Sequence, residues 1–319
     1  MGLLLVGLCG QARAAGRNRD AEALALIDSF FEGSVSGNSL INRLSFFGSE
    51  RMATQVLTDR LRRTVDPKRR GAMLEVLAQV AVPSDDGEVV LMRALGDETL
   101  GNRMSAAKAL GRIKSAAALP KLEPMLADPV LGARREAARA LGTIGKAKAG
   151  RALMAAAKAE EDLDTRGLML VAVGRCGDQK QVAALGAYLE DPSGLTRFSA
   201  AQALCQLGAP KCQTFAKKLL ASSEPLDRLQ AIQLFEGVAL LRAKPVLTLV
   251  LDDADHSVRA AAARVLAQAG DSTKTDWLIV ESNKRENDPS AQLKYESEIE
   301  KLRVTPEQRA AILKKAKTP

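Results

Sequence analysis

The sequence predicts an all-α solenoid of about seven stacked helix pairs with a helical cap at each end. Three observations support this fold class: an arginine recurs at intervals of 33, 31, 32, 31, 31 and 31 residues, and two apolar registers repeat with it. A fixed period in this range is the signature of stacked supersecondary units. The recurring residues, taken as position 0 of each repeat, are Arg70, Arg103, Arg134, Arg166, Arg197, Arg228 and Arg259.

The first apolar register predicts the first helix of each pair. Positions +3, +4, +7 and +10 are apolar in every repeat, and this spacing lies on one face of an α-helix. Glycine at +11 is expected to end the helix in four repeats, because glycine adopts the left-handed C-terminal turn at little cost. The residues at +7 are Leu77, Leu110, Leu141, Val173, Leu204, Phe235 and Leu266, and the glycines are Gly145, Gly177, Gly208 and Gly270.

The second register, centred on an apolar residue at +19, predicts the second helix. Pro120 and Pro245 both fall at +17, where we expect them in its first turn. An aspartate at −6 is expected to act as the N-cap of the next first helix. These aspartates are Asp97, Asp128, Asp191 and Asp253.

The regular register covers residues 66–283 and predicts caps over 18–64 and 284–319. The N-terminal cap is expected to contain helices over Asp20–Phe31, Leu40–Phe47 and Glu50–Arg63. Its phenylalanines either close the end of the stack or form an aromatic docking patch. In the C-terminal cap, Thr305 and Gln308 form a capping box for the last helix. The phenylalanines are Phe30, Phe31, Phe46 and Phe47.

The repeats resemble the HEAT-repeat family, including its subset similar to phycobilisome lyases. The matching pattern is Asp-Pro, then Arg-x-x-Ala-Ala-x-x-Leu-Gly, and it is clearest in Asp128–Gly142, Asp191–Leu204 and Asp253–Leu266. The resemblance implies the fold and does not imply one chemistry, because HEAT proteins share a scaffold rather than an activity.

Residues 1–14 have the features of a signal peptide. The apolar run Leu3–Cys9 is too short to span a bilayer, and Ala12-Arg13-Ala14 is a cleavage site of the A-x-A type. No basic residue precedes the run, which departs from the usual signal peptide. On the strength of the apolar run and the cleavage site, we expect cleavage before Ala15 and a periplasmic or secreted protein, with a cytoplasmic location as the alternative.

The sequence lacks the usual constellations of catalytic residues. His256 is the single histidine, so a histidine metal cluster or a second catalytic histidine is excluded, and we expect it to be a solvated turn residue. No catalytic, metal or cofactor site is predicted. The recurring arginines are expected to form a structural ladder with Asp or Glu of adjacent repeats.

These observations lead us to expect a non-enzymatic scaffold for protein interactions, in a bacterial-type cell envelope. The alternatives are a HEAT-like enzyme of the bilin-lyase type, for which the sequence offers no matching site residue, and a binder of an anionic polymer. Nucleic acid is not expected as the partner, because the net charge of +8 is mild and aromatic residues make up only 3% of the chain.

A row of basic residues at +14 is the expected partner-binding feature. It predicts an edge that attracts an acidic protein, since cations are otherwise unfavourable near the N-terminus of the second helix. The alternative is a solvated edge. The residues are Lys148, Lys180, Lys211 and Arg242.

Cys205 and Cys212 flank one turn between helices and are candidates for a disulfide. Oxidising compartments favour such a bond, and two free thiols are the alternative. Cys176 occupies an apolar register position and is expected in the core.

Overall fold

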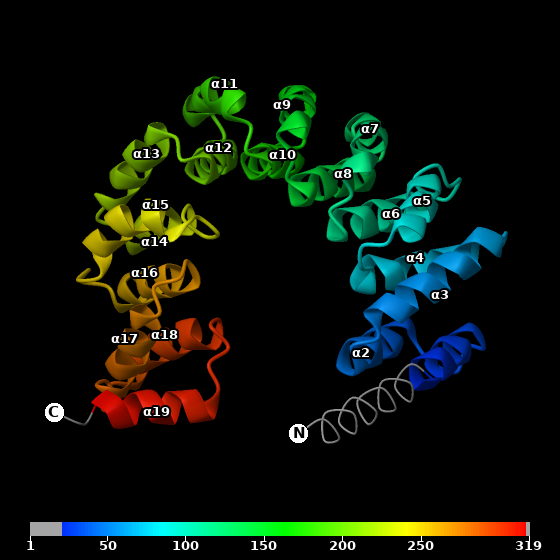
Figure 1. Cartoon of the computed structure of the whole chain (residues 1–319). Coiled ribbons are helices and arrows are strands. Elements are labelled where there is room, and N and C mark those ends of the chain that lie inside the picture. Colours follow the sequence, from blue (N-terminus) through cyan, green and yellow to red (C-terminus); the bar gives the residue numbers. More distant parts are fainter. Residues whose placement is uncertain (1–20, 317–319) are drawn as a thin grey trace, which may run out of the picture. The chain divides into compact units, whose positions relative to one another are not determined.

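The structure is a computed structural model in which residues 21–316 are described (Figure 1). This part of the chain is helical and contains no strand, which confirms the predicted all-α solenoid. It divides into two compact units: unit 1 ends at Asp178 and unit 2 begins at Gln179. The segment 1–14 and the expected cleavage site before Ala15 lie outside the described residues.

Unit 1 is built from two rows of helices, one formed by the first helices of successive pairs and one by the second (Figure 1). Neighbouring first helices pack directly on one another. The first row is α4 (Pro67–Val80), α6 (Leu100–Arg112), α8 (Leu131–Ile144) and α10 (Leu163–Cys176). The second row is α5 (Asp85–Ala94), α7 (Leu119–Leu122, between η1 Ala116–Ala118 and η2 Pro124–Ala127) and α9 (Gly150–Ala159, after η3 Ala147–Ala149).

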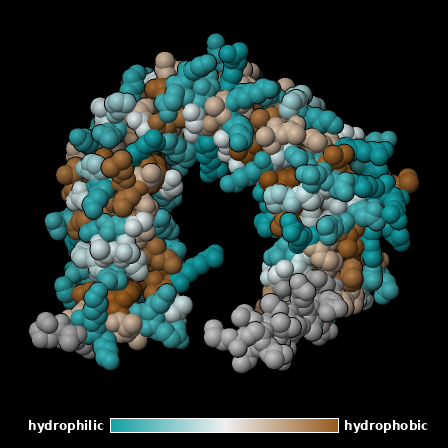
Figure 2. Space-filling model, in the orientation of Figure 1, coloured by the Kyte–Doolittle hydropathy of each residue, from teal (hydrophilic) through white to brown (hydrophobic). Residues whose placement is uncertain are grey.

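Unit 2 repeats the same alternation. Its first helices are α12 (Gly194–Leu207), α14 (Pro225–Gln233) and α16 (His256–Gln268). The second helices are α11 (Val182–Ala187, between η4 Gln179–Gln181 and η5 Tyr188–Glu190), α13 (Pro210–Leu220), α15 (Leu240–Leu247, followed by η6 Thr248–Val250) and α17 (Thr273–Asn283). On the face that Figure 2 shows, hydrophobic residues of unit 2 form small groups between hydrophilic ones.

The apolar register forms the core, as predicted. Every residue at +7, from Leu77 to Leu266, is buried. The expected glycine stops are also present: Gly145 (φ 66°) ends α8 and Gly208 (φ 73°) ends α12, both in the left-handed conformation.

The flanking helices continue the stack. Residues 21–31 are helical, α2 (Gly37–Phe47) packs on α4, and α3 (Glu50–Arg63) packs on α4 and α5. At the other end, α18 (Pro289–Glu300) packs on α16 and α17, and α19 (Pro306–Ala316) packs on α17. The capping box is confirmed, because the Gln308 N–H donates to Thr305 Oγ1 and the Thr305 N–H donates to Gln308 Oε1.

Two local predictions are wrong. The aspartates at −6 are not N-caps: Thr99 and Val130 occupy that position in α6 and α8, two residues after Asp97 and Asp128. The aspartate instead accepts the N–H two residues ahead, as Asp128 does from Val130 at 2.8 Å. Pro245 lies inside α15 rather than in its first turn, because that helix already begins at Leu240.

Candidate functional site

The recurring arginine joins each layer to the next, and Arg134 shows how. Its Nη1 donates to the carbonyl oxygens of Asp128 (2.8 Å) and Pro129 (3.2 Å) in its own layer. Its Nε and Nη2 donate to the two carboxylate oxygens of Glu160 in the next layer, at 2.7 and 3.1 Å. The guanidinium therefore closes a turn with one nitrogen and holds a carboxylate with the other two.

The same arrangement recurs along the stack. Arg228 holds both oxygens of Asp253 at 2.8 and 2.9 Å, Arg70 holds Asp97, and Arg103 lies 4.0 Å from Asp128. Hydrogen bonds from Arg134 hold the pKa of Glu160 below its usual value, although burial opposes the shift. The predicted inter-repeat ladder is confirmed at these layers.

The ladder is interrupted at Arg197. Its Nη1 makes the usual contacts, to the carbonyl oxygens of Asp191 (2.7 Å) and Pro192 (3.0 Å). The position that should supply the next carboxylate is occupied by Ser222, whose hydroxyl donates to Asp227 at 2.6 Å. Within residues 21–316, Arg166, Arg197 and Arg259 are in no ion pair, unlike Arg134 and Arg228. Nε of Arg166 donates instead to the Glu160 carbonyl oxygen and Nε of Arg259 to the Tyr295 hydroxyl, whereas in the same range Arg197 donates only from Nη1.

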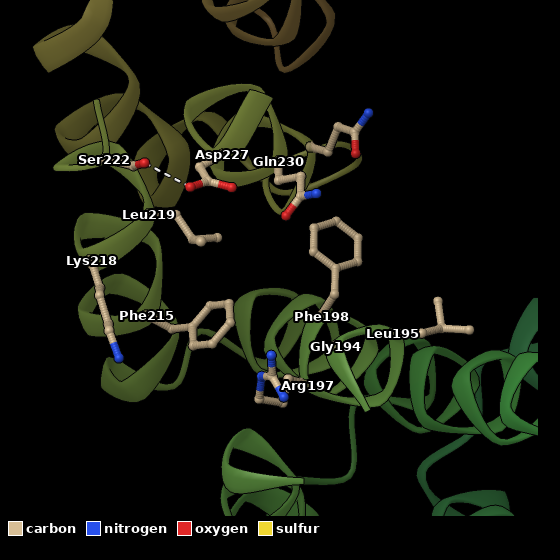
Figure 3. A pocket seen from close by; sticks show the side chains of 11 residues that line it. Gly194, Leu195, Arg197, Phe198, Phe215, Lys218, Leu219, Ser222, Asp227 and Gln230 are labelled. Atoms are coloured by element: carbon tan, nitrogen blue, oxygen red, sulfur yellow. Dashed lines mark hydrogen bonds between the residues drawn. The ribbon is translucent and has the colours of Figure 1, made fainter. Parts of the chain in front are cut away.

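A groove of about 540 Å³ opens beside this interruption, between α12, α13 and α14 (Figure 3). Phe198 of α12 and Phe215 and Leu219 of α13 supply its apolar walls. Arg197 lies at one end, and Asp227 of α14 lies at the opposite end. The groove thus combines apolar walls with a guanidinium and a carboxylate on separate sides.

The layers differ in the residues through which their first helices meet. In unit 1, a Cβ added to Gly142 of α8 would lie 2.9 Å from Ala172 Cβ of α10, so these helices approach through a glycine and an alanine. The equivalent positions, in α12 and at the C-cap of α14, carry Cys205 and Leu234, which are larger. α12 and α14 scarcely touch, whereas α8 and α10 pack along their lengths.

The predicted basic edge is divided between the two units. Lys148 is exposed in η3 of unit 1, and the other three residues are exposed in unit 2. Arg242 donates from Nη1 to the carbonyl oxygen of Gln206 at 2.7 Å. Lys211 lies over α11, where a Cβ on Gly186 would be 2.9 Å from its Nζ. Binding by this row, including Lys180, stays a prediction.

Cys205 and Cys212 are joined by a disulfide with a Cα–Cα distance of 5.0 Å. The bond links the end of α12 to the start of α13, two of the helices that form the groove. Cys176 is buried as a free thiol in the core, and burial raises its pKa to about 11.

His256 is not the solvated turn residue that we expected. It is half-buried as the first residue of α16, and its Nδ1 lies 3.2 Å from the hydroxyl of the fully buried Tyr295. Arg259 and Arg285 both donate to the same nitrogen. The sequence pattern missed this cluster because Tyr295 lies in the C-terminal cap, outside the repeat register.

Two other properties of residues 21–316 bear on the site. No group of three or more His, Cys, Asp or Glu side chains is arranged to hold a metal ion in this range. Over the same residues, no helix has the length and apolar character needed to cross a membrane.

The groove residues were not predicted from the sequence. Phe198 and Phe215 lie at +1 and +18, outside the shared apolar register, so a pattern built on shared positions passes over them. A signal was nevertheless present: the residue at −6 is acidic in the repeats of Arg103, Arg134, Arg166, Arg197 and Arg259, but it is Ser222 in the repeat of Arg228.

The fold is shared with known structures. The complex of CpcE and CpcF of phycocyanin lyase from Nostoc sp. PCC7120 matches 78% of this chain and 94% of its own, at 20% identity and a TM-score of 0.51. An engineered protein matches at 18% identity over 77% of each chain, with a TM-score of 0.44. Human deoxyhypusine hydroxylase matches at 19% identity over 81% of this chain and 98% of its own, with a TM-score of 0.34.

The phycocyanin lyase complex contradicts the prediction that the chain is not an enzyme. We inferred that from missing catalytic constellations, yet an enzyme is built on this same repeat fold. A search for catalytic motifs is therefore a poor test of activity on a scaffold of this kind. None of the curated proteins matches the sequence.

The comparison with families agrees with the repeat register. A family described as HEAT repeats matches residues 54–142 and 150–234, which together make up more than half of the chain. The match begins within α3, earlier than the predicted boundary at residue 66, and this agrees with the packing of α3 on the first regular pair. The chain therefore belongs to the HEAT-repeat family.

Proposed function

We propose that this protein is a protein-binding module that holds an acidic partner through charge. HEAT repeats serve protein interactions, and the observation that carries the proposal is the placement of Lys180, Lys211 and Arg242. They are exposed at the same turn of successive layers in unit 2. Arg242 is also held by the Gln206 carbonyl oxygen, so little conformational entropy is lost when it meets an anion.

The local electrostatics favour an anionic partner over a simple solubilising role. Each of these cations lies near the start of a second helix, where unpaired N–H groups already favour negative charge. A cation placed there adds to that preference. Lys148 occupies the equivalent turn in unit 1.

Charge reversal tests this proposal. Changing Lys148, Lys180, Lys211 and Arg242 together to Glu is expected to abolish binding of a fluorescein-labelled poly-glutamate peptide. In the wild type that binding should weaken with salt, because exposed charges are screened beyond about 10 Å at 0.1 M. Unchanged binding by the folded variant would dispose of the edge as a binding site. Changing Lys68, Lys108, Lys158 and Lys217 to Glu is the control of equal charge.

The same assay separates a protein partner from an anionic polymer. Polyphosphate that competes with the poly-glutamate peptide at equal charge concentration supports the polymer. A protein partner is supported instead when crosslinking in the native host captures a protein with the wild type and not with the charge-reversed variant.

Export to the periplasm or beyond is part of the proposal. The Leu3–Cys9 run supports it, and so does the disulfide between Cys205 and Cys212, since such bonds persist in oxidising compartments. Mass spectrometry of the native N-terminus should find a chain that begins at Ala15. Under denaturing, non-reducing conditions that chain should show one reactive thiol, Cys176, and three reactive thiols would exclude the bond.

A bilin-lyase activity is the second candidate. It is retained because phycocyanin lyase, an enzyme, uses this fold. Titration with phycocyanobilin tests it: a shift of the visible absorbance on binding, followed by transfer to an apo-phycocyanin subunit, would establish the lyase. Absorbance identical to that of the free bilin would count against it.

A further inference from the structure

We infer that the groove between α12, α13 and α14 binds a short segment of a protein in which a carboxylate side chain lies next to a bulky apolar side chain. The inference rests on the proposal that the partner is an acidic protein, and it names what that partner inserts into this groove. The carboxylate takes the place that the ladder leaves empty beside Arg197.

Arg197 has the geometry of the arginines that hold a carboxylate. In Arg134 and Arg228, Nη1 holds two carbonyl oxygens while Nε and Nη2 hold a carboxylate. Arg197 has the same Nη1 contacts, so its Nε and Nη2 are the nitrogens positioned for a carboxylate. A guanidinium anchored in this way offers a two-point contact with little further loss of entropy.

The groove also has an apolar wall. Phe198, Phe215 and Leu219 are only half-buried, and Leu195 at the rim is 43% exposed. An apolar side chain in the groove would cover these surfaces, and aromatic walls beside an anchored charge are typical of binding hot spots.

Asp227 sets the direction in which a segment binds. Asp227 lines the opposite end of the groove, where the Ser222 hydroxyl fixes its carboxylate at 2.6 Å. It repels a second carboxylate there. An acidic segment is therefore held in one direction, with its carboxylate at Arg197 and its apolar side chain over the phenyl rings.

The charge of the groove also argues against the chain's own terminal segments as the occupant. The N-terminal segment carries Arg13, Arg17 and Arg19, and the C-terminal segment carries Lys314, Lys315 and Lys317. Both have the wrong charge for Arg197, which favours a segment of another protein as the occupant.

The most specific test introduces the missing ladder carboxylate into the protein itself. The double variant Ser222→Asp/Asp227→Asn moves the carboxylate to the ladder position without changing the net charge. It copies the layer of Arg103, where Asp97 pairs with Arg70 and accepts from Asn102 at 3.1 Å. The variant should fold at least as stably as the wild type, and the introduced carboxylate should pair with Arg197.

A phage-displayed library of random seven-residue peptides provides the probe. Selection on the wild type should enrich peptides with Asp or Glu within two residues of Phe, Leu, Ile or Met. Their affinity for the double variant should fall about tenfold or more, the value of a lost charge-assisted pair. Asp227→Asn alone should bind these peptides at least as well as the wild type, since Arg197 remains available to the peptide carboxylate.

Three results would overturn the inference: no enriched peptide, enrichment without acidic residues, or equal affinity for the double variant. Light scattering addresses the remaining occupant, because a wild-type oligomer that dissociates in the double variant would show that a second copy fills the groove. The charge-reversed edge variant should still bind the selected peptides, so failure of the edge and failure of the groove are distinguishable.

Discussion

The layers around Arg134 and Arg197 use the same arginine in two different ways. At Arg134 the guanidinium holds Glu160 of the next layer, and the first helices on either side approach through Gly142 and Ala172. At Arg197 the partner is absent, and the neighbouring first helices hardly meet. The difference teaches that a repeat array acquires a site where one layer leaves the side-chain nitrogens of its arginine without the acceptor that other layers supply.

Substitutions in the core should have the largest effect, and they test whether units 1 and 2 depend equally on their cores. Leu141 in unit 1 and Leu204 in unit 2 occupy the same register position and are both fully buried. Changing either to Asp buries an unpaired carboxylate and should cost well over about 4 kcal/mol. Far-UV circular dichroism should show the loss of helix in both variants, and Thr143→Asp, on the exposed surface of α8, is the control.

The single tryptophan, Trp277, reports on unit 2. Because stacked repeats are stabilised through nearest neighbours, Leu141→Asp should change its fluorescence less than Leu204→Asp does. Equal changes would show that the chain unfolds as one cooperative block and that the division into units has no energetic counterpart.

Breaking the closed ladder should have the next largest effect. Glu160→Gln leaves Arg134 without its charged partner and should cost about 1.5–3 kcal/mol near neutral pH. Because the pKa of Glu160 is lowered in the folded state, its contribution is present above the unfolded pKa and is lost as pH falls through the folded pKa. Thermal melts should therefore converge with the wild type in acid. A variant as stable as the wild type near neutrality would contradict the ladder's structural role.

The third prediction concerns the close approach of layers in unit 1. Gly142→Ala adds a Cβ 2.9 Å from Ala172 Cβ and should destabilise by about 1–3 kcal/mol through overpacking. Gly101→Ala in α6 is the matched control, because nothing lies within 4 Å of its added Cβ and alanine favours a helix by about 0.5–1 kcal/mol. Chemical denaturation that gives both variants the same sign would refute the close packing of α8 on α10 at Gly142.

Much of the fold, and little of the candidate site, followed from the sequence. The register predicted the helices because burial at positions such as Leu110 and Leu141 repeats with the period of the stack. The groove departs from that register: Ser222 replaces a carboxylate, and Phe198 and Phe215 occupy positions whose residue type varies from repeat to repeat. Averaging over repeats erases such departures. Only three-dimensional structure shows that they fall on one groove.

The smallest expected effect concerns the other end of unit 2. Where α6, α8 and α10 begin with leucine, α16 begins with His256, which packs against Tyr295 of α18. Burial, followed by the charges of Arg259 and Arg285, lowers the pKa of His256 below 6.5, although Asp255 and Asp288 oppose the shift. The neutral ring therefore accepts hydrogen bonds from Arg259 and Arg285 at Nδ1, which also lies next to the Tyr295 hydroxyl. A proton would place a third positive charge there.

Because this pKa is lower in the folded state than in the unfolded state, the unfolded chain binds the proton more readily. The contribution of His256 to stability is full above about pH 6.5 and is lost as pH falls below that value. His256→Gln keeps an acceptor that does not titrate, so its melting temperature should change less than that of the wild type between about pH 7.5 and pH 5.5. Carboxylates titrate in both proteins and cancel in the difference. Identical pH profiles would show that α18 docks on α16 independently of the charge on His256, and that this end of unit 2, unlike the groove, gains nothing from its departure from the register.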